Sequence, residues 1–89
     1  MRAAKVDKNQ SDIVKALRDC GASVALLHAV GKGMPDLLVG YRQENYLLEV
    51  KDVKGRVNPL QSKWHLEWRG HSFIVRTPVE ALHAIGAMQ

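Results

Sequence analysis

The fold is decided by one stretch, DLLVGYRQENYLLEVK, which covers residues 36–51. Two apolar runs, residues 36–41 and 46–51, are separated by the polar residues 42–45. Apolar runs of this length on either side of a short polar segment predict two strands joined by a hairpin turn. Both strands are apolar enough that we expect them to be largely buried.

Three charged side chains on these strands therefore need an explanation. Alternation along a strand places Glu49 and Lys51 on the same face. We expect Tyr41 to pair with Tyr46 across the turn. This register sets Asp36 opposite Lys51 and diagonal to Glu49, about 7–8 Å away. Buried charges are costly unless they are paired or bind a metal, so the pattern predicts a site.

The expected chemistry of this site follows from its oxygen atoms. Two carboxylates about 5 Å apart repel by roughly 3 kcal/mol at an effective dielectric of about 20, and a divalent cation reverses that sign. Oxygen ligands suit Mg²⁺, for which Mn²⁺ substitutes, whereas zinc prefers His or Cys. Such a cation holds a phosphate and generates hydroxide from water, and Lys51 adds positive charge at the transition state. The predicted reaction is phosphodiester hydrolysis.

The segment before the hairpin predicts a helix and a strand. Residues 8–20 carry apolar side chains such as Ile13 and Leu17 at helical spacing. Gly21 follows, where the C-terminal end of a helix favours glycine. Residues 23–29 are apolar and strand-like.

The segment after the hairpin predicts a helix, a strand and a last helix. Asn58 is a capping residue and Pro59 favours the first helical position, so a helix begins here and ends before Gly70. Residues 72–76 form a short apolar strand. A capping-box sequence then opens a helix that runs to about residue 86.

Length and composition fit a single small domain. The chain has 89 residues, a formal charge of +4 and one cysteine, so no disulfide closes within it. We treat residues 1–89 as one α/β domain of order α-β-β-β-α-β-α. No apolar run suits a membrane span, and we expect a soluble cytoplasmic protein without a membrane partner or an organic cofactor.

The quoted residues resemble those of a known family. Gly33-Met34-Pro35-Asp36 followed by Glu49-Val50-Lys51 is similar to the signature of the PD-(D/E)xK nucleases, and the best match within them is the VRR-NUC domain. The resemblance implies a restriction-endonuclease-like mixed sheet flanked by helices. It implies that Asp36, Glu49 and the Val50 carbonyl hold Mg²⁺ and that Lys51 is catalytic. Stand-alone copies of this domain resemble Holliday-junction resolvases, which act as homodimers.

The first helix of this family usually places a glutamate near the metal, and the candidates here are Gln10 and Asp12. Successive helical residues turn by about 100°, so Gln10 lies within about 60° of the apolar face. Asp12 lies about 200° from Gln10 and faces solvent. We expect Gln10 to assist catalysis, with a weaker ligand atom than a carboxylate.

Other side chains allow two interpretations each. Gln61 opens the second helix and is either a surface residue or a group that orients water or a phosphate. Trp64 and Trp68 either stack on exposed bases or, as we expect from their spacing, pack in the core. Residues 51–69 carry five basic and two acidic side chains. We predict that this stretch contacts DNA phosphates through Lys54, Arg56, Gln61 and Lys63.

The sequence thus predicts a magnesium-dependent endodeoxyribonuclease that prefers branched DNA, acting as a Holliday-junction-resolving homodimer. Two alternatives within enzymes are a flap or nicking nuclease and a restriction-like nuclease. A third alternative is an inactive DNA-binding subunit. Retention of Asp36, Glu49 and Lys51 argues against the inactive subunit, because a protein that only binds does not need two repelling carboxylates.

Overall fold

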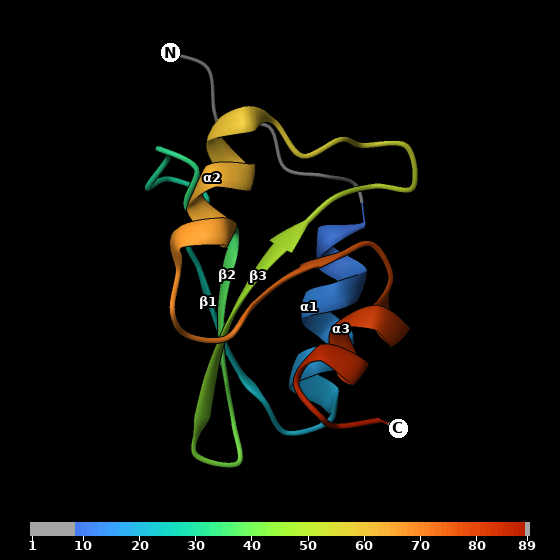
Figure 1. The fold of residues 1–89 in the computed structure, drawn as a ribbon. Helices are drawn as coiled ribbons and strands as arrows, with labels where there is room; N and C mark the ends of the chain where they lie inside the picture. The colour runs from blue at the N-terminus through green and yellow to red at the C-terminus, as the bar shows by residue number, and fades with distance from the viewer. Residues whose placement is uncertain (1–8, 89) are drawn as a thin grey trace.

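The computed structural model describes residues 9–88 and confirms the predicted order of elements. Three helices flank one sheet whose strands lie in the order β1-β2-β3-β4 (Figure 1). β1, β2 and β3 are antiparallel neighbours, and β4 runs parallel to β3. The elements are α1 (Gln10–Asp19), β1 (Ser23–Leu26), β2 (Leu37–Tyr41), β3 (Glu44–Val50), α2 (Pro59–Glu67), β4 (Ser72–Val75) and α3 (Pro78–Ala84).

The core lies between one face of the sheet and the helices α1 and α3, which lie side by side on that face (Figure 1). Helix α1 contributes three apolar residues at helical spacing, and the strands contribute every second residue, as alternation requires. The largest fully buried core side chains are Ile13, Leu17, Leu37, Val39, Leu48, Val50, Val75 and Ile85.

Helix α2 lies on the opposite face, beside the end of the sheet where β3 finishes (Figure 1). It contributes no buried residue. Trp68 is 46% exposed, and its indole stacks on that of Trp64 with 4.7 Å between ring centroids. The expectation that Trp64 and Trp68 pack in the core was therefore wrong, because α2 buries no residue and the two indoles, at the end of α2 and just after it, cover each other instead.

The hairpin turn between β2 and β3 differs from the expected one. Only Arg42 and Gln43 form the turn, both with positive φ (51° and 71°), and Tyr41 pairs with Glu44 rather than Tyr46. Two central residues with positive φ match the right-handed twist of a two-residue hairpin, although neither residue is a glycine here. The absence of glycine hid this tight turn from the sequence pattern.

The corrected register has a consequence for the charged residues. It differs from the expected one by two residues, so every side chain keeps its predicted face. Leu37 pairs with Leu48 at the end of the ladder, so the register brings Asp36, the residue before β2, next to Glu49 instead of Lys51. Directly opposite side chains are closer than diagonal ones. The corrected register therefore places Asp36 nearer to Glu49 than the expected register did.

Element ends differ in smaller ways. β1 ends at Leu26 rather than at residue 29, because the Leu27 carbonyl accepts a bond from the Val30 N–H in a turn. The predicted start of the first helix at residue 8 lies outside the described residues. The capping box of α3 is only half formed: Thr77 accepts from the Glu80 N–H, but the Glu80 carboxylate accepts from the Arg76 N–H.

None of the helices within residues 9–88 has the length and apolar character needed to cross a membrane.

Candidate active site

Asp36 lies immediately before β2 and is held by its backbone and by its side chain. Its carbonyl accepts a hydrogen bond from the Leu27 N–H (2.7 Å), and its Oδ2 accepts one from the Val50 N–H (2.8 Å). Because Val50 follows Glu49 in β3, the second bond brings the Asp36 carboxylate to the end of that strand.

The loop that leads into Asp36 packs against the first turn of α2. Gly33 has a φ of +79°, and a Cβ atom at this position would lie 2.8 Å from the Leu60 carbonyl oxygen. Both the backbone conformation and the close approach require glycine. This contact sets α2 beside the loop that carries Asp36.

Glu49 is buried at the end of β3 with only 2% of its surface exposed. Its Oε2 lies 3.6 Å from Lys51 Nζ and accepts a 3.0 Å hydrogen bond from Gln61 Nε2. Its Oε1 is buried and has no hydrogen-bond partner. A buried carboxylate oxygen without a partner is costly, so this atom calls for a ligand.

The environment of Glu49 favours its neutral form. Burial, then the negative charge of Asp36 and a hydrogen bond that the neutral Glu49 side chain shares with Asp36, raise its pKa from the ordinary value of 4.5 to about 8, and Lys51 only partly opposes the change. The single positive charge of Lys51 thus does not balance the two carboxylates of Asp36 and Glu49 when both are ionised.

We expect the metal-free protein to lose stability as the pH rises from about 5 to about 8. Across this range the folded state keeps the Glu49 proton that the unfolded chain has already released, because its folded-state pKa is raised. The stabilisation is complete below the unfolded pKa and is lost as the pH rises through the folded one, with a slope of at most about 1.4 kcal/mol per pH unit. Urea unfolding at several pH values measures this slope.

Glu49→Gln should flatten that pH dependence. Glu67→Gln is the matched control, because Glu67 is an exposed glutamate at the end of α2 and belongs to none of the ion pairs described within residues 9–88. If the wild type shows no more pH dependence than Glu49→Gln, the carboxylate does not titrate as argued.

Gln61 links α2 to the buried carboxylate and also caps its own helix. Its Oε1 accepts from the Asn58 N–H (3.0 Å), while Asn58 Oδ1 accepts from the Gln61 N–H (2.9 Å). The amide Nε2 remains free to donate to Glu49. Gln61 therefore has a helix-capping role, which the sequence indicated for Asn58 alone, and a contact inside the site.

His65 lies one turn further along α2. Its Nδ1 lies 3.1 Å from the Ser72 hydroxyl on β4, and burial lowers its pKa below 6.5. The neutral ring at pH 7 ties α2 to the sheet.

Gln10 points in the predicted direction. It is 5% exposed, whereas Asp12 is exposed. Among the hydrogen bonds that the structure describes, none joins the Gln10 amide to Asp36, Glu49 or Lys51. Its side chain borders a groove between α1 and β1.

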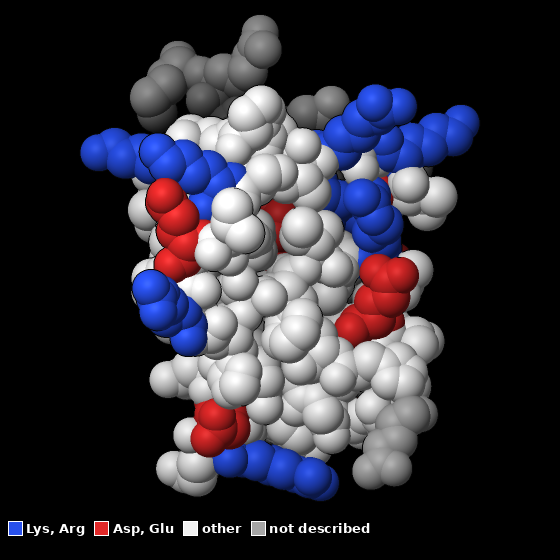
Figure 2. All heavy atoms as spheres, viewed as in Figure 1, with Lys and Arg blue, Asp and Glu red and all other residues white. Residues whose placement is uncertain are grey.

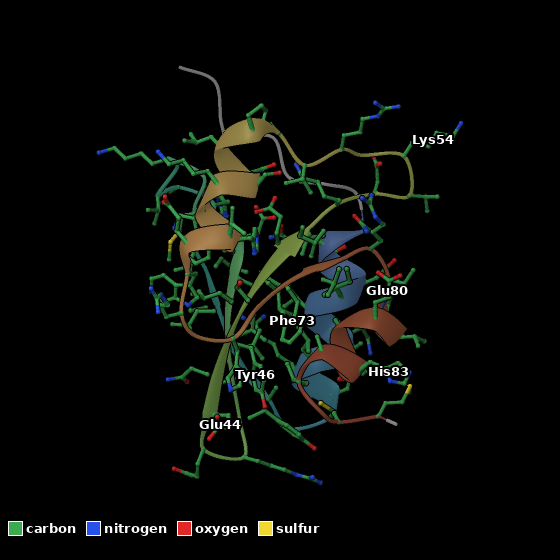
Figure 3. All side chains as sticks on the ribbon, viewed as in Figure 1. Glu44, Tyr46, Lys54, Phe73, Glu80 and His83 are labelled. Carbon is green, nitrogen blue, oxygen red and sulfur yellow. The ribbon has the colours of Figure 1, made fainter. Side chains whose placement is uncertain are left out.

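Basic side chains gather around the same end of the molecule. Lys54, Arg56 and Lys63 are exposed. Figure 2 shows Lys and Arg on both sides of this end, with a recessed acidic area between them, and Figure 3 places Lys54 at its outer edge. The loop that carries Lys54 is held by Arg76, whose Nη1 donates to the Asp52 and Gly55 carbonyls at 2.6 Å each.

The site residues fit a divalent cation that prefers oxygen. Within residues 9–88, no group of three or more His, Cys, Asp or Glu side chains is placed to share an ion. Mg²⁺, however, is commonly held by one or two carboxylates, with water and substrate phosphate completing its shell. The facing carboxylates and the unpartnered Glu49 Oε1 suit such an ion.

A mixed sheet that carries Asp36, Glu49 and Lys51 at the end of a hairpin defines a nuclease domain of the PD-(D/E)xK type. The model of the VRR-NUC domain family matches residues 5–84. The chain therefore belongs to the VRR-NUC domain family, as its sequence motif suggested.

The fold of a solved structure agrees with this assignment. A structure described as a VRR_NUC domain is 25% identical to this chain, with a TM-score of 0.68. The match covers 89% of this chain and 96% of that one. Comparison with curated proteins gave no match.

Proposed function

We propose that this nuclease domain is a magnesium-dependent endonuclease that cleaves branched DNA as a homodimer. The observation that carries the catalytic part is the buried Glu49 carboxylate at the end of β3, with the carboxylate of half-buried Asp36 beside it. Glu49 has one oxygen without a partner, faces Asp36 across the hairpin and has the Lys51 ammonium 3.6 Å away. An inactive binding protein gains nothing from such a pair, which destabilises the fold above the pKa of Glu49.

The chain supplies three kinds of group to the reaction. Asp36, Glu49 and the Val50 carbonyl would hold Mg²⁺, which supplies a Lewis acid for the phosphate and lowers the pKa of water. Lys51 would orient the attacking water and stabilise negative charge on the transferred phosphate. Gln10 would assist from α1.

Gln61 keeps the Glu49 carboxylate in place during these steps. Its donation to Oε2 fixes the rotation of the carboxylate, so that Oε1 remains directed away from the amide. Helix α2 thereby contributes to the orientation of a group on β3.

The basic side chains supply the expected DNA contacts. Lys54 and Arg56 lie in the loop directly after the catalytic strand, and Lys63 lies on the exposed side of α2. Phosphate contacts of this kind give affinity without reading the base sequence. Because such contacts do not read bases, they favour recognition of DNA structure over DNA sequence.

We expect Lys54→Ala with Arg56→Ala to flatten the salt dependence of metal-free DNA binding. Each neutralised phosphate contributes about −0.9 to the slope of log K against log salt, so loss of two contacts should reduce its magnitude by about 1.8. Fluorescence anisotropy with labelled DNA at several salt concentrations measures the slope.

Lys15→Ala with Arg42→Ala is the matched control, because it removes the same charge from α1 and from the hairpin turn. An unchanged slope in the double variant at positions 54 and 56 would mean that the loop is only solvated.

One experiment tests the proposed function as a whole. Labelled four-way junction, flap, splayed and linear duplex DNA are incubated with the protein, with Mg²⁺ or with EDTA. We expect cleavage that requires the metal and is fastest on the four-way junction. Preference for the flap or a nicked product supports the flap or nicking nuclease instead. Binding without cleavage of any substrate supports the inactive subunit.

The dimer has its own test, because resolving a junction needs two cuts placed across a two-fold axis. One chain offers one site, and a C2 homodimer supplies two. Wild type mixed with excess Glu49→Ala should form heterodimers that nick one strand of a junction and rarely release paired products.

Light scattering gives the oligomeric state both free and on junction DNA. A monomer in both cases, with cleavage first order in single chains, rules out the resolvase.

A further inference from the structure

Asn9 stands at the N-terminal cap of α1 but its side chain does not cap the helix. Its Nδ2 instead donates to two backbone carbonyls, that of Lys51 at 2.9 Å and that of Arg76 at 2.7 Å. Lys51 follows Asn9 by 42 positions in the sequence, and Arg76 follows it by 67. The Asn9 side chain thus makes two hydrogen bonds to distant residues in place of the usual capping bond to its own helix.

The two accepting residues occupy equivalent places. Lys51 is the first residue after β3, and Arg76 is the first after β4, the strand parallel to it. The Lys51 N–H donates to the Val75 carbonyl at 3.0 Å. A single amide group therefore joins the start of α1 to the ends of both strands, at the edge that carries Glu49 and Lys51.

The bond matters most for Lys51, because the strand ends there. Beyond it, residues 52–58 form no helix or strand. Two hydrogen bonds hold the Lys51 backbone. Its N–H donates to the end of β4, and its carbonyl accepts from the Asn9 side chain. These two bonds fix the direction in which its side chain leaves the backbone, and the Nζ reaches the Glu49 carboxylate at 3.6 Å.

We propose that Asn9 is a positioning residue that holds the catalytic lysine in its working orientation. The inference rests on the proposed nuclease function. The choice of side chain follows from hydrogen-bond chemistry: an amide has two N–H groups and satisfies both carbonyls, whereas a hydroxyl offers one donor and a carboxylate offers none. Glutamine has the same donors, but its chain is one carbon longer.

A purely structural role predicts a different result from a positioning role, and a double-mutant cycle separates them. Single-turnover cleavage at saturating Mg²⁺ is measured for wild type, Asn9→Ala, Lys51→Ala and the double variant. We expect Asn9→Ala to slow cleavage by about 10–10²-fold, since a small misplacement of a catalytic group has effects of this size. In the Lys51→Ala background the same change should cost no further rate. Metal-free DNA affinity should stay within about twofold of wild type in all four proteins.

Asn45→Ala is the matched control. Asn45 is an exposed asparagine on β3, and its side chain forms none of the hydrogen bonds described within residues 9–88. Asn9→Asp is a second variant of nearly the same shape, in which an oxygen replaces the donating nitrogen and faces the two carbonyls. It should slow cleavage at least as much as Asn9→Ala.

Amide hydrogen exchange supplies a readout that does not depend on cleavage. The Lys51 N–H should exchange about tenfold faster or more in Asn9→Ala than in Asn45→Ala, because the strand ends separate more readily. A wild type that cleaves no DNA overturns the nuclease proposal, and the exchange rates alone then decide whether Asn9 holds the strand ends.

Three results would overturn the positioning role. The first is a folded Asn9→Ala protein with wild-type cleavage. The second is a rate loss in the Lys51→Ala background equal to the loss in wild type, which shows that Asn9 acts on something other than the lysine. The third is failure of both Asn9→Ala and Asn9→Asp to fold, which makes Asn9 a residue of the fold.

Discussion

Glu49→Ala is expected to reduce metal-dependent DNA cleavage to background while leaving the fold intact. The change removes one proposed metal ligand, and with it the buried Oε1 atom, which accepts no hydrogen bond from a protein donor. Asp36→Ala should have the same effect, because its carboxylate lies beside that of Glu49 and is the second proposed metal ligand. Cleavage of the preferred DNA with Mg²⁺ and with Mn²⁺ measures both losses.

The fold should survive because these substitutions also remove like-charge repulsion. The raised pKa of Glu49 shows that its charged form is unfavourable in the folded state. Metal-free stability at pH 8 should therefore not fall in Glu49→Gln, which keeps the side-chain volume. Glu44→Ala, on the exposed part of the same strand, controls for loss of a carboxylate and should cleave like wild type. Near-wild-type cleavage by Glu49→Ala would refute the active site as described.

Lys51→Ala is expected to slow cleavage by about 10²–10³-fold, the usual effect of removing one preorganised group that stabilises charge in the transition state. Its side chain is 16% exposed and its ammonium lies beside Glu49, so its charge acts inside the site more than on the DNA at large. DNA affinity without metal should change much less than the rate. Single-turnover rates and anisotropy titrations give the two quantities separately.

Lys15→Ala provides the matched control for Lys51→Ala. Lys15 is an exposed lysine on α1 that pairs with Asp19 at 2.6 Å. A Lys51→Ala protein that loses affinity and rate in equal proportion would make Lys51 a DNA contact and not a catalytic group.

Short-range sequence signals were enough to predict the helices and strands and to predict which of their side chains face the core. The order of helices and strands follows from apolar spacing and from capping residues such as Asn58 and Thr77, and each of these signals spans only a few residues. The same helical spacing correctly predicted that Gln10 is buried and that Asp12 is exposed. Strand alternation likewise put Glu49 and Lys51 on one face, and a register error of two residues does not disturb that result.

The tertiary structure decided which atoms meet. The turn at Arg42 and Gln43 carries no glycine, so its positive φ angles, and hence the facing of Asp36 and Glu49, were not evident from residue type. Nothing local indicates that an N-terminal asparagine of α1 reaches the ends of β3 and β4, or that a capping glutamine also binds a buried carboxylate. Periodicity reports which side of an element is buried, because burial repeats along the chain. Hydrogen bonds such as those of Gln61 and Asn9 join residues that are 12 to 67 positions apart in the sequence. They produce no repeating pattern in the sequence, because they depend on how the packed elements place single side chains.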